Sequence, residues 1–422
     1  MGKVTTTTAP TVIVRDPAQI RRGRNIGIVY LILAAVTVFS FALGTEGDAV
    51  FRLGARPGEI DVTVPAAGLA WFTAGLCAVL GVVHLITAGL GRWTNLVLGA
   101  IMVLFAVTFL GWAAAGNSFS MAGMLASTVA AATPIAFGGL SGVMSERVGV
   151  INIGIEGMLL IGAFMGAFIG SVAGPLLGVV GAMAAGGLMA LLLAVLAIRY
   201  RVDQIIAGVV INILALGLTS FLSSQILVEN SAEFNSPDIL SRFPIPGLSS
   251  IPVIGPILFN QNIFVYGLMI LIVVLTYALF KTRWGLRSRS VGEHPKAADT
   301  LGIDVYWTRY RNVVMGGLIA GFGGAFFTLG TVGSFNENMT AGRGFIGLAA
   351  MIFGRWHPVG VFGAALVFGF ADALQVRLAI LNVNIASEFL AMIPYLVTIF
   401  VVAGLVGRSR PPAANGQPYI KG

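Results

Sequence analysis

The chain of 422 residues is strongly apolar: hydrophobic residues make up 57% of it, charged residues only 10%, and its mean hydropathy is +0.92. Soluble globular proteins carry about 25% charged residues, so this composition excludes a water-soluble protein. The net charge of +8 comes from basic residues at the ends of apolar runs, which is typical of membrane orientation rather than nucleic-acid binding. The lone Cys77 excludes a disulfide or a cysteine metal site within the chain. We therefore expect a polytopic membrane protein.

The first part of the chain predicts a cytoplasmic tail followed by an N-terminal group of membrane helices. Residues 1–24 are polar, with a basic cluster toward their end. Region 25–116 contains apolar runs near the roughly 20 residues that cross a bilayer. These runs lie at 26–43, 64–90 and 94–115. The loop at 45–61 mixes acids and arginines, and by alternation we expect it on the extracytoplasmic side.

Region 117–407 is expected to form the core of the protein, followed by a second cytoplasmic tail at 408–422. Its apolar runs lie at 121–143, 155–171, 175–198, 205–228, 263–280, 313–332, 344–354, 358–378 and 389–406. The polar segment 229–262 is expected outside the cell, and the basic segment 281–312 inside it. The fold class is therefore all-α and polytopic, with about 10–12 transmembrane or half-spanning helices and both termini in the cytoplasm.

Two irregular, glycine-rich stretches resemble each other. Residues 149–157 precede an apolar run and a Gly-Pro pair, and residues 340–347 precede an apolar run and a His-Pro pair. By loop charge the two would enter the membrane from opposite sides, which favours an inverted repeat of the kind that transporters use. Composition alone would also give two such stretches.

Polar residues in or beside these stretches are candidates for a solute pathway. An ionisable side chain at the bilayer centre costs about 2.5–3.5 kcal/mol on insertion scales, so such residues are functional candidates. The candidates are Glu146, Asn152, Glu156, Phe335, Asn336, Asn338 and Arg343. Each has a structural alternative. Glu146 and Arg147 would form a pair at the headgroups, Glu156 would make structural hydrogen bonds, and the later residues would form an external loop.

Other polar residues favour packing over chemistry. Asp372 and Gln375 lie one helical turn apart and are expected to hydrogen-bond between helices. His84 is isolated on an apolar span and is expected to pack, while His294 and His357 have no second histidine at metal-ligand spacing. The sequence contains no phosphate-binding loop, zinc-protease motif or nucleophile elbow. We therefore expect no metal, no cofactor and no enzymatic activity in this chain.

The basic segment contains the signals of a short helix. Pro295 fits the first helical position, Ala297 and Ala298 are good helix formers, and Gly302 fits the stop. A helix with an alanine face can press closely into a groove on another protein while the flanking arginines stay in water. We interpret it as a cytoplasmic docking helix; the alternative is an ordinary basic loop.

Three stretches resemble the permease subunits of bacterial binding-protein-dependent ABC importers. Residues 292–303 are similar to the coupling-helix pattern Gly-x-Asn-Pro-x-Ala-Ala-x-x-x-Gly-Ile, with His294 at the usual Asn position. Residues 145–157 and 338–355 are similar to the signatures of the nucleoside-type subgroup. The likeness covers roughly residues 121–406 and leaves the N-terminal helices outside it.

The resemblance implies a division of labour in a bacterial cytoplasmic membrane. Separate ATPase subunits would bind the coupling loop, an extracytoplasmic binding protein would deliver the solute, and a second, different permease would complete the path. The coupling residues would be Gly292, Glu293, Pro295, Ala297, Ala298 and Gly302. Nucleosides or related ribose-containing solutes are the expected cargo. The alternatives are a simple sugar, a branched-chain amino acid or, in a different class, an ion-coupled secondary transporter.

Overall fold

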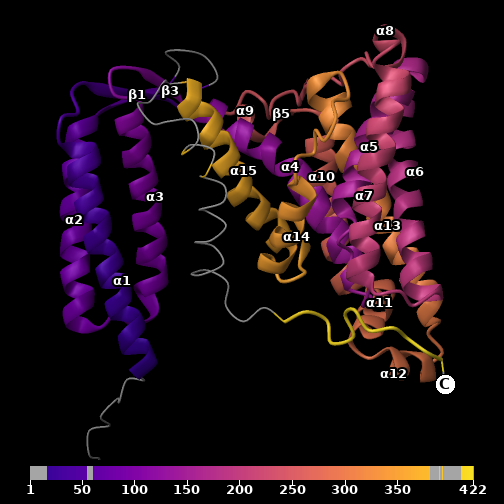
Figure 1. Cartoon of the computed structure of the whole chain (residues 1–422). Helices are drawn as coiled ribbons and strands as arrows, with labels where there is room; N and C mark the ends of the chain where they lie inside the picture. The colour runs from indigo at the N-terminus through magenta and orange to yellow at the C-terminus, as the bar shows by residue number, and fades with distance from the viewer. Residues whose placement is uncertain (1–16, 55–59, 381–388, 390–391, 393–409, 422) are drawn as a thin grey trace, which may run out of the picture. The chain divides into compact units, whose positions relative to one another are not determined.

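The computed structural model describes residues 17–54, 60–380, 389, 392 and 410–421. The chain divides into two compact units, Met1–Met121 and Ala122–Gly422 (Figure 1). Among the described residues, ten helices are long and apolar enough to cross a membrane, and one apolar helix, Arg343–Phe353, is shorter. This confirms the all-α polytopic fold class. The predicted run at 389–406 lies almost wholly outside the described residues, and the inverted repeat stays a prediction.

The first unit is a bundle of three long helices with a small sheet. The helices are α1 (Pro17–Val36, continued by the π-helical turn η1, Thr37–Ala42), α2 (Ala66–Thr87) and α3 (Thr94–Ala113), which follows the 3-10 turn η2 (Gly91–Trp93). The strands are β1 (Asp48–Arg52), β2 (Asp61–Pro65) and β3 (Ser118–Ser120).

Strand β1 lies in the middle of this sheet, antiparallel to β2 and parallel to β3. The sequence predicted only a loop here, because acids and arginines interrupt the apolar pattern. Ala49 and Phe51 nevertheless face inward at every second position, and the Phe51 ring lies 6.2 Å from that of Phe119. Alternating burial on one face is what stabilises such a short strand.

The second unit holds the remaining elements. They are α4 (Met121–Glu146), α5 (Ile155–Ala173), α6 (Pro175–Ala194), η3 (Val195–Arg199), α7 (Gln204–Leu222), η4 (Ser223–Leu227), α8 (Ser231–Phe234), β4 (Phe243–Pro244), α9 (Ile254–Leu258), β5 (Asn260–Gln261), α10 (Ile263–Lys281), α11 (Arg283–Glu293), α12 (Pro295–Thr300), α13 (Val305–Phe327), η5 (Thr328–Val332), α14 (Arg343–Phe353) and α15 (Pro358–Ile380). Helix α8 lies at one end of this unit and α12 at the other, called below the α8 end and the α12 end (Figure 1).

Glycines let the helices α5, α6 and α13 approach backbone to backbone. A Cβ atom on Gly162 of α5 would lie 2.7 Å from the carbonyl oxygen of Gly321 on α13, and one on Gly186 of α6 would lie 2.7 Å from the Gly321 Cα. Where helices meet in lipid without a hydrophobic driving force, small residues supply the close packing that holds them together. These three helices form a closely packed group within the unit.

The basic segment forms two helices at the α12 end. Helix α12 begins at Pro295 as predicted, and the His294 Nδ1 atom accepts a hydrogen bond of 3.2 Å from the Ala297 main-chain nitrogen. Gly302 follows the helix with a φ of +79°, as expected of a stop. Helix α13 begins at Val305 rather than at residue 313, because Asp304 caps it by accepting from the Trp307 nitrogen at 2.9 Å. Its first turns are polar, so hydropathy alone misses them.

Candidate functional site

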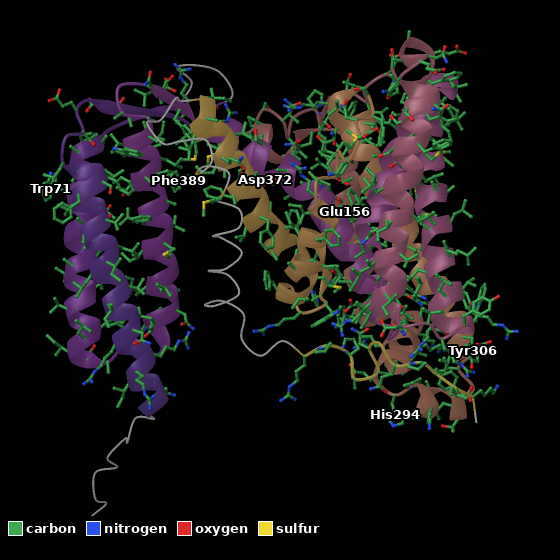
Figure 2. All side chains as sticks on the ribbon, in the orientation of Figure 1. Trp71, Glu156, His294, Tyr306, Asp372 and Phe389 are labelled. Atoms are coloured by element: carbon green, nitrogen blue, oxygen red, sulfur yellow. The ribbon has the colours of Figure 1, made fainter. Side chains whose placement is uncertain are left out.

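Glu156, in the first turn of α5, binds the start of α14. Its Oε1 atom accepts hydrogen bonds from the Thr340 hydroxyl at 2.6 Å and the Gly342 nitrogen at 2.8 Å. Its Oε2 atom accepts from the Gly344 nitrogen at 2.6 Å. The side chain is only 8% exposed, and Figure 2 shows it between the two ends of the second unit. Glu156 therefore joins the two stretches that the sequence singled out.

The geometry explains why a carboxylate stands at this position. The first N–H groups of a helix have no partner within it, and the helix dipole places partial positive charge there. Glu156 satisfies two such N–H groups of α14. Gly344 has to lack a side chain, because a Cβ atom there would lie 2.6 Å from the Glu156 Cα. Helix α14 has 11 residues, or about 16 Å, so it is half-spanning for a bilayer core of about 30 Å.

Side chains of α7 satisfy the irregular backbone that leads into α5. The Gln204 Oε1 atom accepts from the Ile151 nitrogen at 2.7 Å. The Asn212 side chain donates to the Ile153 carbonyl at 2.9 Å and accepts from the Gly157 nitrogen at 2.8 Å. Non-helical backbone at membrane depth is tolerated only where protein groups replace water. These two amides therefore allow the chain to enter α5 without a regular turn.

Glu146 lies at the end of α4, where it binds the turn between α14 and α15. Its Oε2 atom accepts from the Trp356 indole nitrogen at 2.7 Å and from the Asn415 side-chain nitrogen at 2.9 Å. Arg147 donates through its Nε atom to the Trp356 carbonyl at 2.9 Å. Arg355 and Trp356 both have positive φ, which is uncommon for residues with a side chain. Glu146 and Arg147 therefore both bind this turn.

Two arginines lie against one ring beside this turn. The guanidinium carbons of Arg147 and Arg289 lie 5.3 and 5.1 Å from the centre of the Phe280 ring. His357 stacks on the same ring at 4.6 Å. Burial lowers the pKa of Arg147, and the positive charge of Arg289 lowers it further. Cation–π contact of this kind stabilises charge at a partly buried site.

Phe335 and its neighbours form the segment before α14. The Phe335 ring is buried and packs edge-on against Phe164 at 5.3 Å. Asn235 holds its main chain, accepting from the Phe335 nitrogen at 2.6 Å and donating to the Phe335 oxygen at 3.0 Å. Asn336 and Asn338 are exposed, and Asn338 has a φ of +53°. Phe335 is therefore a packing anchor, whereas the side chains of the two asparagines are exposed.

An ion pair joins α14 to α15. The Arg343 Nη2 atom lies 3.6 Å from the Asp372 Oδ2 atom, and the Arg343 guanidinium lies 5.7 Å from the centre of the Phe327 ring. Asp372 and Gln375 were expected to hydrogen-bond between helices, and Asp372 joins α14 to α15 by this ion pair instead. Arg343 thus begins α14 beside the Glu156 contact, so the structure brings Glu156 and Arg343 together at one place.

The other predicted pathway residues lie elsewhere in the unit. Asn152 is buried in the connection between α4 and α5 and donates to the Ser145 hydroxyl at 3.3 Å. Glu146 lies at the α12 end, away from the start of α14. Sequence reasoning missed Gln204, Asn212, Thr340, Trp356 and Asn415. Asn212 is an amide within an apolar run, and this signal was sufficient to identify it.

The predicted coupling residues lie on α11 and α12, except Gly302, which follows α12. The two alanines differ in their exposure. Ala298 is 2% exposed and faces inward, whereas Ala297 is exposed. The expectation of one shared alanine face is therefore wrong, because successive residues point about 100° apart around a helix. Leu301, one turn after Ala297, is 80% exposed. The outward face of α12 thus presents Ala297 and Leu301.

The remaining coupling residues have distinct surroundings. Gly292 packs against the Arg147 carbonyl with no room for a side chain. The exposed Glu293 accepts a hydrogen bond of 3.2 Å from the Ala413 nitrogen. Pro295 is half-buried at the first position of α12. Across the described parts of the chain, no three His, Cys, Asp or Glu residues come close enough together to hold a metal ion.

His84 in the first unit packs as predicted. It is buried, and its Nδ1 atom lies 3.0 Å from the Leu80 carbonyl one turn earlier. Its ring meets that of Tyr30 edge-on at 5.1 Å.

Known proteins resemble this chain over the second unit. Residues 124–402 match the family model described as branched-chain amino acid transport system / permease component. The guanosine ABC transporter permease protein NupQ of Bacillus subtilis is 44% identical over 310 residues, covering 70% of this chain and 96% of that protein. The nucleoside ABC transporter permease protein NupC of Lactococcus lactis is 40% identical over 309 residues, 71% of this chain and 96% of that protein. No solved structure matches the chain at a significant level.

Proposed function

We propose that this chain is the membrane permease subunit of an ATP-driven nucleoside importer. The premise is that the chain belongs to the family of branched-chain amino acid transport system permease components. The observation that carries the proposal is the 44% identity to a guanosine permease across 96% of that relative. The chain is a non-catalytic, multi-pass subunit of the plasma membrane, and ATP hydrolysis takes place on separate subunits. It needs no cofactor of its own.

The ATPase subunits bind at the α12 end, which lies in the cytoplasm in this proposal. Basic residues gather there at the ends of α10 and η3, in the turn after η3, and on α11 and α12. The positive-inside rule places such ends in the cytoplasm. These basic residues include Arg199, Arg201, Lys281, Arg283, Arg287 and Lys296. The outward face of α12, with Ala297 and Leu301, fits a groove on an ATPase. We propose further that both termini of the chain are cytoplasmic, because the polar segments at both ends of the sequence carry basic residues.

The extracytoplasmic binding protein meets the α8 end in this arrangement. Glu229, Glu233 and Asp238 lie in the segment around α8, and their acidic character opposes the basic α12 end. The binding protein would release its nucleoside there into the path. ATP binding then shifts the permease between outward-open and inward-open states by supplying differential binding energy.

The solute path runs along the start of α14 and is completed by a second, different permease. Asn338 and the 47%-exposed Phe345 offer an amide and an aromatic face near Arg343. A nucleoside presents hydroxyl groups and an aromatic base, so these are suitable partners for it. Glu156 does not itself meet the solute in this proposal, because its oxygens are occupied by the start of α14. It fixes the surface along which the solute passes.

Affinity purification of the tagged chain from native membranes in mild detergent tests the proposal. We expect an ATPase, a second permease and an extracytoplasmic binding protein to accompany it. The isolated binding protein is then screened with guanosine, ribose, glucose and leucine. Binding of glucose or leucine in place of nucleosides would refute nucleosides as the substrate but would leave the assignment as an ATP-driven importer intact. A homo-oligomer without partner proteins that transports under an ion gradient would refute the assignment as an ATP-driven importer.

A further inference from the structure

The C-terminal segment Arg410–Lys421 runs across the α12 end in extended contact with the protein (Figure 1). The Ala414 nitrogen donates to the Gly292 carbonyl at 2.9 Å, and the Gly416 nitrogen donates to the Gly149 carbonyl at 3.2 Å. Gly149 and Gly416 both have positive φ, at +84° and +77°. The segment is thus bound through its main chain to α11 on one side and to the connection before α5 on the other.

Buried charged groups hold the middle of the segment. Asn415 donates to the Glu146 carboxylate at 2.9 Å, and Glu146 in turn accepts from Trp356. Arg309 on α13 is 1% exposed and donates to the carbonyls of Val148 at 3.1 Å and Gln417 at 3.0 Å. A buried guanidinium requires such acceptors, since its desolvation is expensive when they are missing. The segment therefore supplies groups that the rest of the unit needs.

Tyr419 anchors the end of the segment beneath α12. It is 5% exposed and belongs to the same buried cluster as Ala298 and Val305. Its ring lies 5.3 Å from that of Tyr306, whose hydroxyl donates to the Tyr419 carbonyl at 3.3 Å. The Nζ atom of Lys421, two residues further on, lies 3.9 Å from the Oδ1 atom of Asp299 on α12. Figure 2 shows Tyr306 and His294 together at this end.

We propose that residues 411–421 are a positioning segment that makes α11, α12, the end of α4 and the start of α13 move as one body. The segment binds every one of these elements, and through Glu146 it also reaches the turn between α14 and α15. A displacement of α12 is therefore passed to the turn that follows α14, the helix along which the solute passes. Without the segment, α12 keeps its outward face but loses its connection to the Glu146 turn.

This inference rests on the proposed function and makes the tail a part of energy coupling rather than of ATPase docking. Its contacts point inward, toward Gly292, Gly149, Glu146 and Arg309, whereas the face of α12 that presents Ala297 and Leu301 remains free. Loss of the segment should leave the assembly intact and separate ATP hydrolysis from uptake. If the tail served only for docking, its loss would instead release the ATPase from the complex.

The test compares the full chain with Asn415→Ala, Tyr419→Ala and a chain that ends at Arg410, each in the complex with its partner subunits. The matched control is Ile420→Ser, which changes an exposed side chain of the same segment. For each protein we would measure three quantities: co-purification of the ATPase, the rate of ATP hydrolysis with and without guanosine-loaded binding protein, and guanosine uptake. Hydrogen exchange of residues 411–421 reports whether the segment is bound in each protein.

We expect the three variants to retain the ATPase and its basal hydrolysis while uptake per ATP falls by about fivefold or more, the lower range of coupling between sites. The control should behave as the full chain. Loss of the ATPase from the complex, or unchanged uptake in all three variants, overturns the inference. If the truncated chain is recovered from membranes only in low yield, the variants Asn415→Ala and Tyr419→Ala alone test the inference. Failure of the full chain itself to bind an ATPase or take up guanosine would instead refute the proposed function.

Discussion

Glu156 Oε2 lies 2.6 Å from the main-chain nitrogen of Gly344, so the first turn of α5 is tied to the first turn of α14. The two residues are far apart in sequence and belong to the two glycine-rich stretches. A charge-assisted hydrogen bond of this length is among the stronger kinds in proteins. Together with the two hydrogen bonds to Glu156 Oε1, it holds the start of the half-spanning helix α14 against α5. One carboxylate of α5 therefore contributes directly to the position of α14, beside the ion pair between Arg343 and Asp372.

Replacing Glu156 by Gln should weaken this connection. The amide has one acceptor oxygen, and its NH₂ group would face a main-chain N–H of α14. We expect a loss of about 1–3 kcal/mol, as for an unsatisfied buried donor, and reduced uptake with the protein still in the membrane. Thermal unfolding of the purified protein and uptake by cells measure both effects. Unchanged melting and uptake would make Glu156 a bystander.

Gly344→Ala should be destabilising for a steric reason. The added Cβ atom would lie 2.6 Å from the Glu156 Cα, and overpacking of this kind costs about 1–3 kcal/mol. Gly363→Ala on α15 is the matched control, because no atom lies within 4 Å of a Cβ atom there. The test compares the melting temperatures of the two variants, and we expect the lower value for Gly344→Ala. Equal values would show that α14 can shift away from α5 without penalty.

Asn212→Ala should destabilise the entry into α5. It leaves the Ile153 carbonyl and the Gly157 nitrogen without their partner, at about 1–3 kcal/mol for each buried group. Ser224→Ala is the control, since that exposed hydroxyl bonds only within its own turn. The free energies of unfolding of the two variants are compared in detergent. A loss for Asn212→Ala no larger than for the control would mean that other groups satisfy this backbone.

Tryptophan at the two alanines of α12 should have different effects. Ala297→Trp changes an exposed face, so the protein should fold normally and lose coupling to the ATPase. Ala298→Trp forces a large ring into a buried cluster and should lower stability by about 1–3 kcal/mol. Melting temperature and ATPase co-purification separate the cases. A normal complex with normal uptake for Ala297→Trp would contradict the docking face.

His357 predicts a dependence of stability on pH. Burial, followed by the positive charge of Arg147, lowers its pKa from 6.5, so the folded protein favours the neutral imidazole. This contribution to stability is fully present above pH 6.5 and is lost as the pH falls through the lowered pKa. The difference in melting temperature between the protein and His357→Gln should therefore shrink between about pH 7.5 and about pH 5.5. A difference that grew on acidification would contradict this.

The spans were predictable because their signal is local. Apolar runs of sufficient length end at Pro, Gly or charged residues, so α2, α5 and α15 lie close to where hydropathy placed them. The start of α13 was not predictable in this way, since Asp304 begins a helix whose first turns are polar. The strands β1 and β2 were missed because pairing between short segments depends on contacts distant in sequence.

The candidate site was only partly predictable for the same reason. Glu156 and Arg343 stand out as ionisable residues in apolar surroundings, and the structure brings them to one place. Their partners Thr340 and Gly344 carry no comparable signal, since a hydroxyl or a main-chain N–H becomes important only through its position in the fold. The tail residues Asn415 and Tyr419 lie in a short polar end that composition alone describes as unstructured.

Guanosine uptake into proteoliposomes is the most direct test of the central claim. The chain is reconstituted with the ATPase and binding protein that co-purify with it, together with the proposed second permease, and ATP is enclosed on the side of the ATPase. We expect uptake that requires ATP and the binding protein and that does not change when sodium and proton gradients are collapsed. Uptake by the chain alone, driven by an ion gradient and indifferent to ATP, would contradict it.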